Sequence, residues 1–123
     1  MVNSTFNRST NILESHFKND VHLHEVVDYI RATKENKTYP RKLKILTNAL
    51  QATFKFNYDD LKVIISENNK SLEQYDAIID AIIIDSPQTA ALTVLYQELA
   101  KNKKYFFNVF STHEAAVIWL EEF

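Results

Sequence analysis

The sequence of 123 residues contains no glycine. Backbone amides that cradle a phosphate group usually require glycine, because the chain has to approach the ligand closely. The P-loop, the dinucleotide-binding fingerprint and the G-x-S-x-G nucleophile elbow are therefore excluded. This absence removes the best-marked enzyme classes of this size, although it does not exclude every enzyme.

Without glycine, another residue has to occupy any left-handed backbone position, and asparagine tolerates that conformation best. Asn36, Asn69 and Asn102 each follow or end a segment with a helical pattern. We therefore predict that these three asparagines terminate helices with positive φ angles, in the place that glycine usually takes.

Cysteine is also absent, which excludes disulfides, thiol catalysis and thiolate metal ligands. Hydrophobic residues make up 46% of the chain and charged residues 24%, so we expect a single globular domain over residues 1–123. The net charge of −2 gives no basic excess for a nucleic-acid partner. No segment has the pattern of a signal peptide or a membrane span, and we expect a cytoplasmic protein without membrane insertion.

Hydrophobic periodicity predicts alternating strands and helices. The isoleucine-rich run at 77–84 predicts a central strand, and residues 105–110 predict the last strand. The other expected elements are an edge strand or frayed end at 1–9, strands at 11–18 and 42–46, a loop at 47–55, and helices at 21–35, 58–68, 87–101 and from the capping box 111–114 onwards. This order is typical of an α/β fold with a mixed, largely parallel sheet of four to five strands flanked by about four helices.

Apolar side chains at helical or strand spacing indicate which residues face the core. In the helix predicted after Pro87 these residues are Leu92, Leu95, Tyr96 and Leu99, and in the final helix they are Ala116, Leu120 and Phe123. Alternation places Tyr105, Phe107 and Val109 on one side of the last strand and Phe106 and Phe110 on the other. Both sides are apolar, so that either helices cover both or one side meets a partner. Trp119 lies off the final helical stripe and belongs to the core, an exposed patch or an apolar pocket.

Three stretches of the carboxy-terminal half occur together in a known family: Ala-Ile-Ile-Ile-Asp-Ser-Pro at 81–87, the strand at 104–110, and Phe-Ser-Thr-His-Glu-Ala-Ala at 110–116 followed by Trp119-Leu120. In this order they resemble the small bacterial STAS-like proteins, relatives of the anti-sigma-factor antagonist domain and mostly of uncharacterised function. The similarity covers residues from about 42 to the end, whereas the first forty match in element order only. It implies a mixed sheet flanked by helices, and a role in protein contact or ligand sensing rather than catalysis.

Anti-sigma-factor antagonists carry a phosphorylatable serine, usually preceded by aspartate, at the start of the helix after the third strand. We expect the corresponding stretch at 46–50 and beyond, where no Asp-Ser pair occurs. Thr47 and Thr53 are the only hydroxyl residues nearby. This departure argues against a phosphorylation switch.

Asp80 and Asp85 lie on or beside the predicted central strand, where open α/β sheets bind ligands. Asp85 next to Ser86 is a possible nucleophile pair, with His113 as its base. The simpler interpretation is that Ser86 caps the following helix and Asp85 interacts with its positive end.

Other polar groups have similar structural interpretations. His22 and His24, with His16 as a third ligand, are a possible metal site, but on a helix residues i and i+2 point apart. The carboxylates of Asp59, Asp60 and Glu67 fit the first turns of a helix, and the basic residues Lys101, Lys103 and Lys104 fit a helix end. We therefore predict no catalytic residue, metal or cofactor.

The leading hypothesis is a non-catalytic, regulatory module that binds a protein partner, with a second copy of the chain as one possibility. The alternative is a sensor for an apolar small molecule such as a lipid, which requires a cavity of a few hundred Å³ or more. A small hydrolase or transferase centred on Asp85 and Ser86 ranks third. The residues predicted to form an interaction surface or pocket are Asp85, Ser86, Tyr96, Trp119 and Phe123.

Overall fold

The computed structural model describes residues 1–123 and contains one sheet with the strand order β1-β2-β3-β4-β5. The strands are β1 (Val2–Asn7), β2 (Ile12–Val21), β3 (Lys42–Phe54), β4 (Ala77–Ile83) and β5 (Tyr105–Phe110). The helices are α1 (Leu23–Glu35), α2 (Leu61–Leu72) after the short 3-10 helix η1 (Tyr58–Asp60), α3 (Pro87–Leu99) and α4 (His113–Glu121). Strand β1 pairs antiparallel with β2 and all other pairs are parallel, which confirms the predicted α/β architecture.

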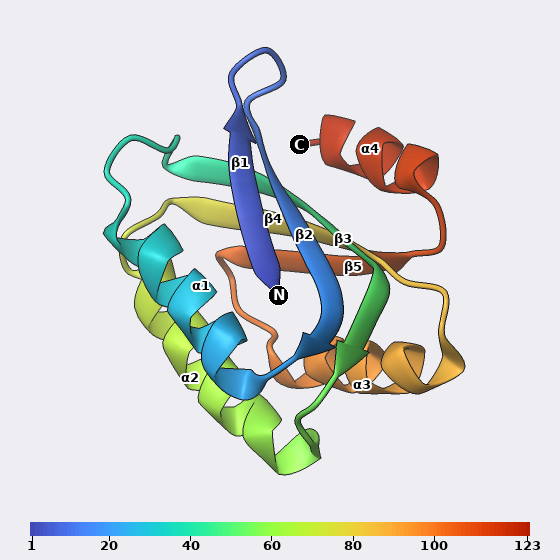
Figure 1. The fold of residues 1–123 in the computed structure, drawn as a ribbon. Coiled ribbons are helices and arrows are strands. Elements are labelled where there is room, and N and C mark those ends of the chain that lie inside the picture. Colours follow the sequence, from blue (N-terminus) through green and yellow to red (C-terminus); the bar gives the residue numbers. More distant parts are fainter.

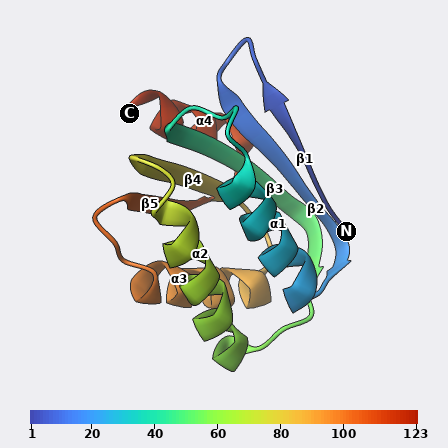
Figure 2. The same cartoon turned by 90° about the vertical axis from the view of Figure 1, so that its left-hand side faces the viewer.

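Helices α1, α2 and α3 cover one face of the sheet, and α4 covers the other (Figures 1 and 2). The predicted alternation along β5 is confirmed, because Phe107 packs with the cluster under α1 to α3 whereas Phe110 packs with α4. Ala116 and Leu120 of α4 are fully buried, as their spacing predicted. No helix of the structure combines the length and the apolar character that a membrane crossing demands.

Strand β3 is longer than the sequence pattern indicated, and the loop predicted at 47–55 is wrong. Pairing with β4 ends at Asn48, but β3 continues beside β2 as far as the pair Phe54 and Val21. The polar residues of this segment do not show a strand pattern, because pairing with the neighbouring strand, and not the segment's own strand propensity, stabilises the extended conformation. The next helical segment therefore begins at Tyr58, capped by Asn57, and no serine or threonine stands at its start.

The prediction that three asparagines end helices with positive φ is wrong. Only Asn11 (φ 59°) and Asn19 (φ 57°) adopt that conformation, in the β1–β2 turn and after an irregularity in β2. Asn36 ends α1 in an extended conformation, with φ −77°. Its side-chain Oδ1 accepts a hydrogen bond from the Thr38 amide at 2.8 Å, so that a side chain, not a left-handed residue, shapes this turn.

Helix α3 packs Leu92, Leu95 and Tyr96 against the core as predicted, but the fourth residue of the predicted stripe does not pack there. Leu99 is half exposed, whereas Thr89 and Thr93 are buried. The Thr93 hydroxyl donates to the Thr89 carbonyl oxygen at 3.0 Å, so its burial leaves no hydrogen bond unmade. Counting apolar residues missed the two threonines, because threonine can face a core when its hydroxyl bonds to its own helix.

Candidate functional site

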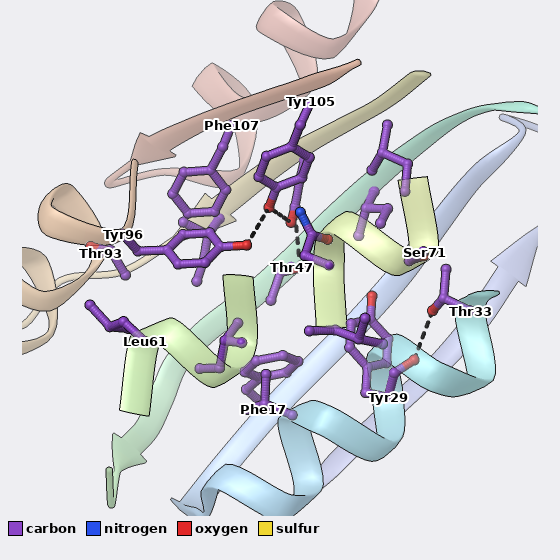
Figure 3. Close-up of a pocket in the computed structure, with 18 of the residues that line it drawn as sticks. Phe17, Tyr29, Thr33, Thr47, Leu61, Ser71, Thr93, Tyr96, Tyr105 and Phe107 are labelled. Carbon is purple, nitrogen blue, oxygen red and sulfur yellow. Dashed lines mark hydrogen bonds between the residues drawn. The ribbon is translucent and has the colours of Figure 1, made fainter. Parts of the chain in front are cut away.

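A cavity of about 100 Å³ lies between the sheet and helices α1, α2 and α3 (Figure 3). Twenty-one residues line it, of which 15 are hydrophobic. Strands β2 to β5 and all three helices contribute side chains to the wall. The cavity is partly open to solvent, and a space of this size beside the core is distinct because protein interiors contain few voids larger than a water molecule.

The floor of the cavity follows from strand alternation. On β4, Ile78, Asp80 and Ile82 point toward the cavity, while the residues between them pack under α4. On β5, Tyr105 and Phe107 lie opposite Ile78 and Asp80 in the parallel register. Asp80 is therefore the one acidic side chain in a wall that is otherwise apolar or neutral.

Asp80 is held by two hydroxyl groups. The Tyr105 hydroxyl donates to Asp80 Oδ2 at 2.9 Å, and Thr47 Oγ1 donates to Asp80 Oδ1 at 3.5 Å. The Tyr96 hydroxyl donates in turn to the Tyr105 oxygen at 3.2 Å. Figure 3 shows the two tyrosine hydroxyls directed at each other across the cavity wall. The carboxylate is thus fixed in position by residues from β3, β5 and α3.

Burial raises the pKa of Asp80 to about 6, although the hydrogen bonds from Tyr105 and Thr47 act in the opposite direction. The pKa of Tyr105 and of Tyr96 lies above its usual value, mainly through burial and further through the negative charge of Asp80. At neutral pH, Asp80 is therefore mostly ionised and both tyrosines are neutral. Asp80 lies deep in the protein yet keeps accessible surface, which is the surface that borders the cavity.

The far wall of the cavity is formed by α1 and α2. Tyr29 of α1 shares a hydrogen bond with Ser15 of β2 at 2.5 Å, and burial raises the pKa of its phenol.

Arg31 of α1 donates two hydrogen bonds to the Glu67 carboxylate of α2, at 3.0 and 3.2 Å. This planar pair ties the two helices together and lowers the pKa of Glu67.

Of the five residues predicted to form a site, only Tyr96 borders the cavity. Asp85 is exposed just beyond β4, and Ser86 precedes α3 without a hydrogen bond from its side chain to the helix. No hydrogen bond joins Asp85, Ser86 and His113. These three residues therefore form no hydrogen-bonded group in the structure.

Trp119 and Phe123, the remaining two, lie on the opposite side of the sheet. Their ring centroids are 5.0 Å apart. The Trp119 ring also packs against Phe110 of β5, and the Phe123 ring packs against Phe106 of β5. The cluster is half buried, and beside it on α4 Ile118 is 56% exposed. We call the group formed by Phe106, Phe110, Ile118, Trp119 and Phe123 the α4 patch.

The histidine rings of His22 and His24 do not point apart as predicted but stack at 5.9 Å. His22 precedes the helix in an extended conformation, so the helical i, i+2 geometry does not apply to it. No group of three potential ligands forms around the pair or elsewhere in the chain.

The other charged groups that the sequence singled out are dispersed. Asp60 and Asn57 exchange hydrogen bonds of 3.0 and 3.1 Å at the start of η1. Lys104 donates to the carbonyl oxygen of Leu72 at the end of α2, and Lys101 pairs with Glu98. These carboxylates and lysines therefore stabilise helix ends.

Sequence reasoning considered Asp80 together with Asp85 at the ligand-binding end of the sheet but did not include it among the predicted site residues, although a further signal was present. Asp80 is an acid in the middle of an isoleucine-rich strand that is covered on both faces. An ionisable group at such a position is costly unless it has partners or a function. The alternation along β5 additionally predicted that Tyr105 and Phe107 share one face.

No protein-family model matches the sequence, and no curated protein matches it at a significant level. Among solved structures, the chain is similar to an uncharacterized protein of the DUF3478 family with a SpoIIAA-like fold from Shewanella loihica PV-4. The two share 12% sequence identity over 97% of this chain and 93% of that chain, with a TM-score of 0.63. At this identity the likeness concerns the fold alone. The chain therefore has the SpoIIAA-like, that is STAS-like, fold that the sequence resemblance predicted.

Proposed function

We propose that residues 1–123 form a single, non-catalytic regulatory module that binds a small, largely apolar molecule in the cavity between the sheet and α1 to α3. The observation that carries the proposal is a cavity of about 100 Å³ in which 15 of 21 lining residues are hydrophobic. Leaving such a space unfilled forfeits packing contacts, and a ligand of matching shape restores them.

The cavity volume limits the size of the ligand. An apolar cavity of about 150 Å³ accommodates benzene, whereas drug-sized ligands need about 300 Å³ or more. A lipid, the example considered from the sequence, is too large for about 100 Å³. The ligand is therefore a compact molecule with about six non-hydrogen atoms or fewer.

The composition of the wall supports binding rather than catalysis. It contains no histidine, lysine or arginine, so Asp80 is the only group in the wall that titrates near neutral pH. The Tyr105 hydroxyl that bonds to Asp80, and the Tyr96 hydroxyl behind it, have raised pKa values, which makes them hydrogen-bond donors and not nucleophiles.

Cyclopentanol is a suitable neutral probe for the cavity. We expect it to shift the NMR signals of cavity residues, and Thr93→Leu to weaken its affinity by at least about fivefold by filling part of the space. Thr93 is a suitable position because its hydroxyl bonds only to carbonyl oxygens of its own helix. Val94→Leu is the matched control, since Val94 is exposed on the same helix. Equal affinity in both variants would contradict a site in this cavity.

The α4 patch supports a second candidate function, contact with a second copy of the chain. Ile118 and Phe106 are 56% and 42% exposed beside half-buried aromatic rings, and exposed apolar patches mark interaction sites. We expect Ile118→Glu to abolish concentration-dependent dimerisation in light scattering. Val63→Glu is the control, because Val63 is a similarly exposed residue of α2. A wild-type protein that stays monomeric at high concentration would rule this contact out.

A further inference from the structure

The negative charge of Asp80 has no cationic partner in the protein. None of the ion pairs in the structure involves Asp80, and no lysine, arginine or histidine lines the cavity. A buried carboxylate is normally paired with a cation or coordinated to a metal. Here two neutral hydroxyls are its hydrogen-bond partners, so the charge itself stays uncompensated.

The two oxygens of this carboxylate are not equally satisfied. Oδ2 accepts a short bond from Tyr105 at 2.9 Å, whereas Oδ1 accepts only from Thr47 at 3.5 Å, the outer limit of hydrogen bonding. Each carboxylate oxygen accepts about two hydrogen bonds, so Oδ1 retains acceptor capacity. Because the accessible surface of Asp80 borders the cavity, a bound molecule can reach this atom.

We propose that the ligand is a small organic cation, a protonated amine on a compact apolar body, whose N–H group donates to Asp80 Oδ1. This inference rests on the proposed ligand-binding function and names the chemical class of the ligand. An alcohol donates one neutral hydrogen bond at this position, whereas an ammonium group also neutralises the buried charge.

The rest of the wall suits such a molecule. Tyr96 and Phe107 lie beside Asp80 with their rings in an edge-to-face arrangement at 5.0 Å. Aromatic faces attract cations that have lost part of their hydration. The apolar side chains of Ile64 and Ile82 line other parts of the cavity, where the hydrocarbon body of the ligand packs. Above a pH of about 6 Asp80 is ionised and attracts the cation. A cation bound beside the carboxylate stabilises its charged form and so lowers its pKa.

Three probes of nearly equal shape test this inference: cyclopentylamine, cyclopentanol and methylcyclopentane. Their affinities are measured by NMR titration at about pH 8, where Asp80 is ionised and the amine is protonated. The proteins are the wild type, Asp80→Asn and, as a control for net charge, Asp85→Asn. The Asp80→Asn substitution preserves the size of the side chain and an acceptor for Tyr105, while Asp85 is exposed and outside the cavity.

We expect the wild type and Asp85→Asn to bind cyclopentylamine at least about tenfold more tightly than cyclopentanol. In Asp80→Asn this preference should disappear, with the affinity for cyclopentanol nearly unchanged. Equal affinities for amine and alcohol in the wild type, or a preference that persists in Asp80→Asn, would overturn the cationic ligand while leaving the binding function intact. If none of the three probes binds to the wild type, the proposed function itself fails. The comparison of probes on the wild type needs no variant to fold.

Discussion

The two faces of the sheet are packed differently, although β4 supplies alternate residues to both. Under α4, Ile79, Ala81 and Ile83 are completely buried and meet Ala116 and Leu120, which are also completely buried. Under α1 to α3, Ile78 and Ile82 flank Asp80 beside a cavity of about 100 Å³. One face is filled with apolar side chains, and the other combines incomplete packing with a buried charge.

Under the proposed function, the two faces of a single strand serve stability and ligand binding respectively. Close packing under α4 anchors the sheet, and incomplete packing is tolerated on the other face because the rest of the structure is well packed. Incomplete packing and uncompensated charge both reduce stability, and natural proteins retain such features mainly at functional sites. This contrast supports the proposal that the ligand binds on the face covered by α1 to α3.

The largest expected effect compares one leucine on each face. Leu120→Ala should lower the free energy of unfolding by about 4 kcal/mol, because it opens a void in a filled core. Leu61→Ala should cost at least about 1 kcal/mol less, since Leu61 already borders the cavity and has fewer packing partners there. Urea denaturation of both variants measures the difference. Equal losses would show that the two faces are equally well packed.

The next effect comes from the charge of Asp80. Burial raises its pKa from 3.8 to about 6, so the folded state binds the proton more tightly than the unfolded state. Its contribution to stability is therefore complete below about pH 4 and is lost as the pH rises through about 6, a change of about 3 kcal/mol.

Denaturation of the wild type and Asp80→Asn across this pH range isolates that contribution. The stability of Asp80→Asn relative to the wild type should increase between about pH 4 and pH 6 and then level off. A difference that is independent of pH would show that Asp80 titrates normally in the folded protein.

Tyr105→Phe probes the hydrogen bonds of the cavity face. It removes the donor to Asp80 Oδ2 and the acceptor of the Tyr96 hydroxyl, so we expect a loss of about 2 kcal/mol at neutral pH. The pKa of Asp80 should rise above about 6, because the bond that favours its charged form is gone. Tyr58→Phe serves as the control, since Tyr58 is 62% exposed. An unchanged Asp80 titration in Tyr105→Phe would contradict the assigned role of this bond.

The smallest expected effect compares the stability lost when the N-cap residue of a helix on each face is replaced. Thr112 Oγ1 accepts a hydrogen bond from the Ala115 amide at 3.2 Å, so Thr112→Ala should cost about 1 kcal/mol. Ser86 stands at the same position of α3 but its side chain makes no such bond, and Ser86→Ala should cost clearly less. Thermal denaturation of the two variants tests this, and a larger loss for Ser86→Ala would reverse the assignment.

Much of the fold could be predicted from the sequence where local and tertiary preferences agree. The last strand was predicted at its observed bounds because five of its six residues are aromatic or β-branched and the residues on either side of it are polar. The second half of β3 was missed because it is held by β2, a neighbour that only the tertiary fold supplies. The same reason explains Asn19, whose positive φ follows the local irregularity of β2.

The candidate site was harder to predict than the fold. Alternation predicted that Tyr105 and Phe107 share a face, and spacing predicted that Tyr96 turns inward. The cavity itself depends on how completely helices of a given size fill the space above the sheet, which no periodicity encodes. The lone acid among the isoleucines of β4 is the sequence feature that marks this site most directly.

The carboxyl group of Asp80 allows the most direct test of this interpretation. Its titration can be followed by carbon-13 NMR in the free protein and in the presence of saturating cyclopentylamine. We expect a midpoint at about 6 in the free protein, which falls when the cation binds beside the carboxylate. A midpoint near the ordinary value of 3.8, or one that the amine does not change, would contradict a buried, ligand-binding Asp80.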